Sequence, residues 1–217
     1  TLSTLGVFKQ CVANLLPIPS KLHYVFSLRN IVRVLKGITL VAPEFVASDT
    51  QFYRVWYHEM CREFHDRFNM DKDRSFFLKV MDQMMDKNFK QTFEQLCPNG
   101  PPMLNEFADS SQKYKEVVCT QEQLLTTCTT MLEENNRDAT KPIDIVLFSE
   151  AIDHLSSLSR IFAMNRGHAL LVGVKSSGRK SLARLALHTA SFESFEIAIT
   201  RTYGFNEWRE DLKNLFK

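Results

Sequence analysis

Residues 168–181, HALLVGVKSSGRKS, constrain this chain more than any other stretch. A short apolar run leads into a loop bounded by Gly173 and Gly178, and a helix-like stretch with basic and hydroxyl residues follows. This layout is typical of a phosphate-binding P-loop. In such a loop, backbone N–H groups converge on a phosphate and a lysine adds positive charge. The sequence therefore predicts an anion site between a strand and a helix.

The spacing departs from the usual order of glycine, four residues, glycine, lysine and a hydroxyl residue. Four residues separate Gly173 from Gly178, but Arg179 and Lys180 both precede Ser181. In one register Arg179 takes the lysine position. In the other, Lys180 and Ser181 keep their roles and the loop is longer. Both registers weaken the case for hydrolysis, because a wide guanidinium fork replaces a compact ammonium poorly in a tight loop.

Two bulky residues also stand inside the loop. Lys175 and Ser176 occupy positions where glycine would give the backbone most freedom to turn its amides inward. The nucleotide site requires these amides to point inward, and it requires the segment before Gly173 to be paired in a sheet. The alternative is a strand-to-helix turn with a basic cap that holds no ligand.

The composition limits the classes of protein to which this chain can belong. With 217 residues, 44% of them hydrophobic, the chain can bury the cores of one or two domains. Its net charge of +2 gives no electrostatic argument for binding nucleic acid or an anionic membrane. The five cysteines form no CxxC pair and no cationic-apolar leader opens the sequence, so we expect a reduced protein of the cytoplasm. The longest apolar run, 169–172, is too short to span a membrane.

The first 140 residues have helical periodicity. Apolar residues at helical spacing predict helices over 28–35, 49–68, 74–90 and 124–132. We expect Gly37 to end the first helix and Asp49 to N-cap the second. The segment 97–103 is predicted to be a loop, and 134–142 a linker. A domain boundary near residue 140 follows.

Helices and strands alternate after this boundary. The pattern predicts helices over 148–162, 182–190 and 204–217, and strands over 169–174 and 195–200. This order is typical of a parallel α/β sheet, whose ligands bind at the carboxyl ends of the strands. The predicted fold is therefore mixed α and α/β: a helical region, 1–140, and the start of a P-loop α/β domain, 141–217. No further strand with a magnesium-holding acidic pair follows, so we do not expect this segment to hydrolyse ATP alone.

Other candidate chemistry is weaker. His58, Cys61 and His65 share a helical face, but their spacing does not match a zincin site, so we predict no protein-held metal. No serine or cysteine nucleophile is paired with a histidine. Arg29 is either a helix-surface charge or a ligand of a nucleotide phosphate, and its spacing does not decide between them.

Five stretches resemble dynein heavy chains: 21–38, 54–68, 142–161, 167–186 and 199–213. The resemblance covers nearly the whole chain. It implies a segment that leaves the helical lid of the third AAA+ module of the motor ring and enters the fourth module through its P-loop. Axonemal forms are favoured, because they carry a similar HALLVGVGGSGKQSL stretch. This chain departs from it at Lys175, Ser176, Arg179 and Lys180.

The resemblance also implies functional residues. Arg29 matches a lid arginine that completes the third module's nucleotide pocket, and Val146, Leu147 and Phe148 match apolar residues near the adenine. Ser181 would reach a magnesium ion. The residues expected around the phosphates of ATP or ADP are Gly173, Val174, Lys175, Ser176, Ser177, Gly178, Arg179, Lys180 and Ser181.

The implied parent is an ATP-driven motor that walks on microtubules. Its partners would be the rest of the heavy-chain ring, the microtubule through the stalk, and the intermediate and light chains. Its place would be the cytoskeleton, most often the axoneme of a cilium or flagellum. The substitutions in the loop favour regulatory nucleotide binding over fast hydrolysis, and the short linker suggests that lid and P-loop move together. The alternative is a non-catalytic scaffold with a vestigial loop and a partner surface on the helices of 49–90.

Overall fold

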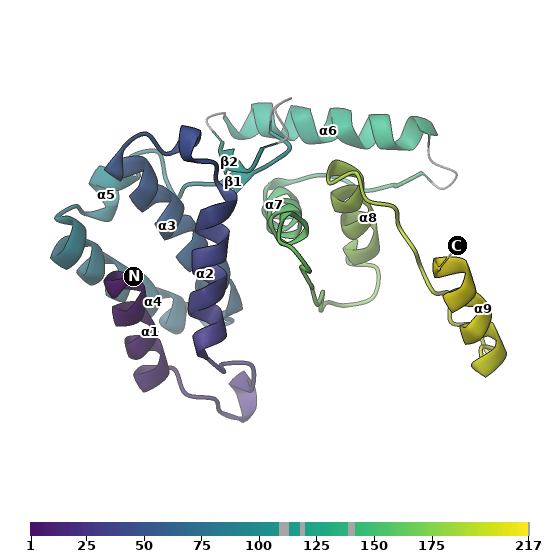
Figure 1. The fold of residues 1–217 in the computed structure, drawn as a ribbon, viewed down its shortest axis with the longest axis horizontal. Coiled ribbons are helices and arrows are strands. Elements are labelled where there is room, and N and C mark those ends of the chain that lie inside the picture. The colour runs from purple at the N-terminus through teal and green to yellow at the C-terminus, as the bar shows by residue number, and fades with distance from the viewer. Residues whose placement is uncertain (109–112, 118–119, 139–141, 217) are drawn as a thin grey trace.

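A computed structural model of the chain describes residues 1–108, 113–117, 120–138 and 142–216. The described residues are mostly helical, and their one sheet has two strands. Helices α1 to α5 form an N-terminal lobe, α6 to α8 form a second group, and α9 lies apart at the far end (Figure 1). The α-helices are α1 (Leu2–Asn14), α2 (Leu28–Leu40), α3 (Asp49–Glu63), α4 (Asp71–Phe89), α5 (Phe93–Leu96), α6 (Gln121–Asp138), α7 (Ser149–Ala163), α8 (Arg179–Thr189) and α9 (Phe205–Leu215).

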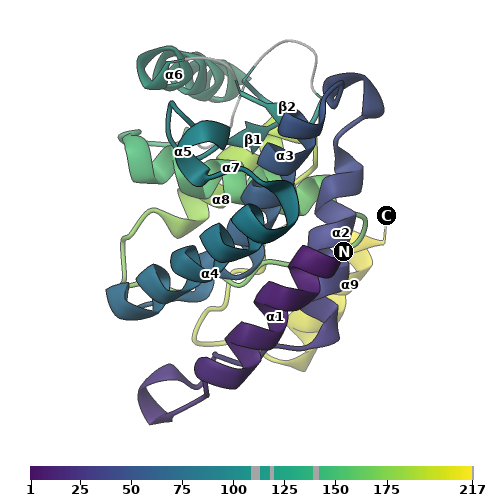
Figure 2. The same ribbon diagram turned by 90° about the vertical axis from the view of Figure 1, so that its left-hand side faces the viewer.

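The N-terminal lobe contains the largest core. Helix α1 lies along α4, in front of the other elements in Figure 2. Phe64, Phe68 and Phe77 are almost completely buried, and the rings of Phe64 and Phe77 stack with their centroids 6.2 Å apart. Aromatic side chains of this size remove a large apolar area from water, so this cluster holds α3 and α4 together.

The helix boundaries of this lobe differ from the predicted ones in two places. Ser48, and not Asp49, caps α3: its Oγ accepts a hydrogen bond from the Gln51 backbone N–H, and Gln51 Oε1 accepts one from the Ser48 backbone N–H. Gly37 does not end α2, which continues to Leu40. That helix ends because Pro43 follows and forces the residue before it into an extended conformation.

A small hairpin lies between the two groups of helices. Strand β1 (Leu104–Asn105) pairs with the antiparallel strand β2 (Lys115–Glu116), just beyond the loop predicted over 97–103. The sequence analysis did not predict these strands, because two residues are too few to give a periodic pattern. Leu104 and Tyr114 pack on Val41 and Val55, so the hairpin is fixed to the C-terminal end of α2 and to the middle of α3.

The second group of helices shares one core. Helix α7 packs along α8, and α6 covers both. The buried side chains include Ile152 and Leu155 from α7 and Leu182 and Leu185 from α8. Helix α6 continues to Asp138, so the first part of the predicted 134–142 linker is helical, and residues 139–141 lie outside the described part of the chain.

The two predicted strands are absent from the structure. Residues 169–174 and 195–200 are not paired in a sheet. Leu170, Val172 and Ile199 are 89%, 85% and 82% exposed, although the prediction placed 169–174 in a buried strand. A strand is stabilised by cross-strand pairs, and the described residues offer these segments no strand to pair with. The predictions of helices α7, α8 and α9 are confirmed.

The mixed helical and α/β fold class is confirmed by the helical content, the small sheet and the family matches given below. In the described ranges, no helix is both long and apolar enough to cross a membrane.

Candidate functional site

The predicted phosphate loop is a tight turn at the start of α8. Ser176 and Gly178 both have positive φ, 63° and 74°, and the Ser177 N–H points to Val174 O at 3.4 Å. Gly178 is the N-cap residue of α8, and its carbonyl accepts the first helical hydrogen bond from Leu182 N–H at 2.8 Å. The loop therefore ends where the backbone N–H groups of a helix start are unpaired and can hold an anion.

Gly173 closes the other side of this loop. A Cβ at this position would lie 2.9 Å from Ser177 Oγ and 3.3 Å from Arg179 Cδ. The close approach shows that the Arg179 side chain folds back across the loop towards Gly173. A larger residue at 173 would displace the Ser177 hydroxyl and the Arg179 side chain.

The charged residues of the loop differ in their surroundings. Lys175 and Lys180 are exposed, whereas Arg179 and Ser181 are half-buried. No acidic residue lies in the first turn of α8, which begins with Arg179 and Lys180. Positive charge is unfavourable at a helix N-terminus. An anion bound at this loop would relieve that repulsion.

The predicted adenine residues run beside the loop. A Cβ on Gly178 would be 3.4 Å from Ile145 Cδ1, so the segment 143–148 passes the start of α8. Val146 and Phe148 are 79% and 55% exposed, whereas Leu147 packs on the second core. The structure thus brings this segment and the loop together.

Arg29 lies on the other lobe, in the first turn of α2. It is exposed, the first turn of α2 contains no acidic residue, and no carboxylate of the described chain pairs with it. Arg33, one turn later, has its Nη1 3.6 Å from Glu63 Oε1. Arg29 is therefore an exposed cation at this helix start with no ion pair to a carboxylate of the described residues.

His58 and Cys61 on α3 lie in surroundings that disfavour metal binding, and His65 lies just beyond the end of this helix. His58 is buried, and its two ring nitrogens lie 2.9 Å from Pro102 O and 3.3 Å from Tyr114 Oη. Burial, followed by the Arg62 charge, lowers the pKa of His58 to about 3. Burial raises the pKa of the Cys61 thiol to about 12, so the thiolate needed for metal binding is disfavoured. The described residues contain no group of three or more candidate ligands.

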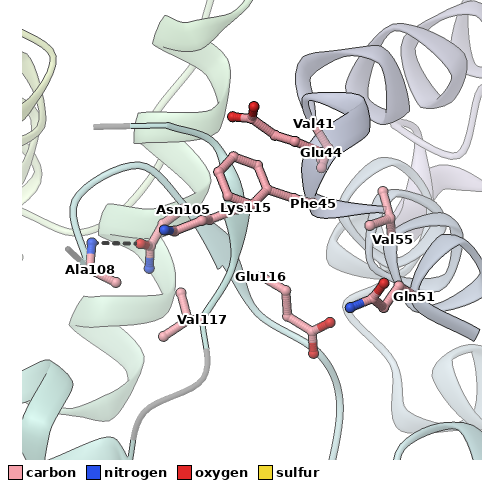
Figure 3. A pocket seen from close by; sticks show the side chains of 10 residues that line it. All are labelled: Val41, Glu44, Phe45, Gln51, Val55, Asn105, Ala108, Lys115, Glu116 and Val117. Carbon is pink, nitrogen blue, oxygen red and sulfur yellow. Dashed lines mark hydrogen bonds between the residues drawn. The ribbon is translucent and has the colours of Figure 1, made fainter. Parts of the chain in front are cut away.

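A separate cavity of about 410 Å³ opens beside the hairpin (Figure 3). Lys115 Nζ lies 4.9 Å from the centre of the Phe45 ring, and Glu116 forms an ion pair with Arg54. The Asn105 Oδ1 accepts a hydrogen bond from Ala108 N–H at 2.9 Å. The residues that line this cavity belong to the N-terminal lobe and the hairpin, and none comes from the phosphate loop.

Sequence reasoning missed one buried group of residues. It assigned no role to Glu59, but the Glu59 carboxylate is completely buried and forms an ion pair with Arg160. The two residues are 101 positions apart, so spacing gave no signal for their contact. The only local sign is that Arg160 stands on the buried face of α7.

Comparison with known proteins gives two family matches and several relatives. Residues 2–97 match the AAA+ lid domain, and residues 143–217 match the P-loop containing dynein motor region D4. Dynein axonemal heavy chain 1 of Mus musculus is 36% identical over 215 residues, 98% of this chain. Dynein axonemal heavy chain 10 of Homo sapiens is 39% identical over 220 residues, 100% of this chain.

The chain spans only about 5% of the length of these two relatives. The lid match covers the N-terminal lobe, and the D4 match covers α7, α8, α9 and the phosphate loop. The resemblance inferred from the sequence is therefore confirmed: the chain belongs to the dynein heavy chain family, in which it matches a lid and the P-loop region that follows it.

Proposed function

We propose that this chain is the nucleotide-responsive segment of a microtubule-based, ATP-driven dynein motor. In this proposal, the loop from Gly173 to Ser181 binds ATP or ADP together with Mg²⁺. The observation that carries the proposal is the match of residues 143–217 to the dynein P-loop region D4. The turn at Gly178, with the unpaired N–H groups at the start of α8, supports it.

The loop residues fit the nucleotide in distinct roles. Gly173 leaves the space that a Cβ would fill, and the first turn of α8 offers backbone N–H donors to the phosphates. Arg179 and Lys180 supply positive charge. Ser181, in the same turn, would bind the Mg²⁺, and this ion would neutralise phosphate charge when bound.

The same residues favour a regulatory site over fast hydrolysis. Phosphoryl transfer depends on precisely placed charge. Arg179 folds across the loop, and Ser176 holds a positive φ that a serine adopts only at a cost. A site of this kind binds nucleotide and responds to it, but turns it over slowly.

The remaining parts of the proposal concern the parent protein. Arg29 completes a nucleotide pocket of the preceding module from its lid side, and Val146, Leu147 and Phe148 border the adenine of the loop's own nucleotide. The partners are the heavy-chain ring, the microtubule, and the intermediate and light chains. Since the relatives are named as axonemal, we place the protein in the axoneme of a cilium or flagellum.

Titration with a labelled adenine nucleotide tests the proposal. It should use the full heavy-chain motor, with and without Mg²⁺, and compare the wild type with Arg179→Ala/Lys180→Ala. We expect the double variant to lose one bound nucleotide per chain. Lys213→Ala, at an exposed position on α9, is the control and should bind as the wild type does. An equal number of bound nucleotides, at equal affinity, in the double variant would refute the proposal.

One observation favours a second candidate function. Residues 169–174 are not paired in a sheet among the described residues, so the pairing that the nucleotide site was expected to require is not met, as in a loop that no longer forms a site. In that case the chain is a scaffold whose helices α3 and α4 contact a partner. The same titration decides, because a scaffold predicts no loss of bound nucleotide in the double variant.

A further inference from the structure

The N-terminal lobe and α7 are joined by a fully buried ion pair. Glu59 on α3 has no exposed side-chain area, and Arg160 on α7 has 6%. The Arg160 Nε and Nη2 atoms both donate to Glu59 Oε2, the first at 2.8 Å. Burial lowers the pKa of Arg160, but the charge of Glu59 and its hydrogen bonds, together with the charges of Tyr114 and Glu63, outweigh burial, and the pKa is raised. Arg160 therefore stays charged beside the Glu59 carboxylate.

Two further segments surround the same carboxylate. Tyr114, just before β2, donates its hydroxyl to Glu59 Oε1 at 2.8 Å. Gly37 of α2 lies against the other oxygen: a Cβ at position 37 would be 1.7 Å from Glu59 Oε2 and 3.0 Å from Arg160 Nη2. Helices α2, α3 and α7 and the hairpin thus meet at one carboxylate.

A buried ion pair is a costly way to join two helices. Each ion loses several kcal/mol of hydration, so apolar residues of similar volume are often as stabilising or more so. An ion pair also constrains the relative orientation of the two helices, because a guanidinium must face a carboxylate at a fixed distance and angle. The Glu59–Arg160 pair therefore determines the angle between the N-terminal lobe and α7 more than it stabilises the fold.

Helix α7 links the ion pair to the phosphate loop, because it packs on α8. Ile152 and Leu155 of α7 form a common core with Leu182 and Leu185 of α8. Helix α8 starts at the loop residue Arg179. Close-packed helices shift together, because an interior of this density has few empty spaces to absorb a displacement. A displacement of Arg160 is therefore transmitted through α7 to the start of α8.

We propose that Glu59 and Arg160 are positioning residues for the phosphate loop. Their ion pair holds the lid and the α7–α8 unit as one rigid body, so that a nucleotide at the loop and the orientation of the lid are coupled. The regulatory part of this inference rests on the proposed nucleotide binding, but the rigid connection does not. The short 134–142 linker was expected to make this connection, whereas these contacts assign it to a side-chain pair.

The test measures a distance in the full heavy-chain motor. Probes are placed through unnatural amino acids at the exposed residues Lys87 on α4 and His188 on α8. The variant is Glu59→Met/Arg160→Met, which removes both charges at similar volume. We expect one narrow distance distribution in the wild type and a distribution about twice as wide, or shifted, in the variant.

The control removes a different ion pair of the same chemistry. Arg54 donates to both oxygens of Glu116, at 2.9 and 3.1 Å from its Nε, and this pair joins α3 to β2 without reaching α7. Arg54→Met/Glu116→Met should leave the distribution narrow. A purely structural effect would widen both distributions equally, and that result would overturn the inference. An unchanged distribution in the Glu59 and Arg160 variant would also overturn it.

Two further measurements keep the inference falsifiable. If the double-methionine variant does not fold, Arg160→Lys replaces it, since lysine keeps the charge but loses the planar fork and should still widen the distribution. Motor ATPase activity of the same variants tests the coupling: Lys180→Ala should change this activity less in the Glu59→Met/Arg160→Met background than in the wild type. An equal change in both backgrounds refutes the coupling. An equal number of bound nucleotides, at equal affinity, in the wild type and in Arg179→Ala/Lys180→Ala refutes the proposed function and leaves the distance measurement valid.

Discussion

The Asn30 side chain joins the start of α2 to the buried carboxylate of Glu63. Its Nδ2 donates to Glu63 Oε1 at 2.6 Å, and its Oδ1 accepts from the Ser27 backbone N–H at 2.8 Å. Glu63 also accepts from Arg67 Nη2 at 2.7 Å. The amide is therefore specifically required: it donates to one group and accepts from another, which a carboxylate cannot do.

Asn30→Asp should destabilise the chain. The change places two carboxylates in contact in a buried site, and we expect a loss of about 2 kcal/mol in the free energy of unfolding at neutral pH. The loss should shrink as pH falls, because protonation of the new carboxyl, whose pKa is raised in the folded state, removes the repulsion. Urea denaturation measures this effect. Asn14→Asp, at an exposed position, is the control and should change stability by less than about 0.5 kcal/mol.

Gly37→Ala should be more damaging than an ordinary helical substitution. Alanine is preferred to glycine inside a helix by about 1 kcal/mol, but here the new Cβ would lie 1.7 Å from Glu59 Oε2. The carboxylate would have to leave Arg160, so we expect a net loss of about 3 kcal/mol, measured by denaturation. Gly6→Ala, also within a helix, meets only the flexible side chain of Met84 at 2.7 Å and should be nearly neutral. Equal effects of the two variants would contradict the assigned role of Gly37.

Much of the helical structure could be predicted from the sequence. Helices α3, α4 and α7 follow their apolar periodicity, because each buries one face in a core formed by helices that lie near in sequence. The prediction of a strand over 169–174 was wrong, because periodicity describes the segment alone, whereas a strand depends on a partner strand. The turn at Gly178, by contrast, depends on local backbone conformation and was predictable.

The contacts between distant residues could not be predicted. Glycine at position 37 has the same appearance in the sequence whether it ends a helix or admits a carboxylate, and only the position of Glu59 decides between them. The Glu59–Arg160 pair joins residues from separate helices, and neither residue carries a local signal of its partner. Patterns in a single sequence reflect local periodicity, so they do not predict contacts between residues this far apart.

His58 should make the chain sensitive to acid. Burial lowers the pKa of His58 from 6.5 to about 3, so the folded state keeps the ring neutral while the unfolded state binds a proton. Stability should therefore be constant above about pH 6.5 and fall by about 1.4 kcal/mol per pH unit between pH 6 and pH 3. Urea denaturation across this range measures the slope. His58→Gln removes the titrating ring and should flatten this part of the curve, and an unchanged slope would show that other groups cause it.

Ser176→Gly should strengthen the phosphate loop. Ser176 has a φ of 63°, a left-handed conformation that costs a serine about 1 kcal/mol more than a glycine. Relief of this strain, and the greater freedom of the loop amides to turn inward, should raise the affinity for labelled ADP about fivefold in the full heavy-chain motor. The matched control is Ser176→Ala, which removes the same hydroxyl but keeps a Cβ at the positive φ and therefore leaves the strain in place. If both variants bind ADP equally well, or if Ser176→Gly binds it more weakly than the wild type, then backbone strain at Ser176 does not limit the site. The affinity would in that case be set by the charges of Arg179 and Lys180, which the alanine variants test separately.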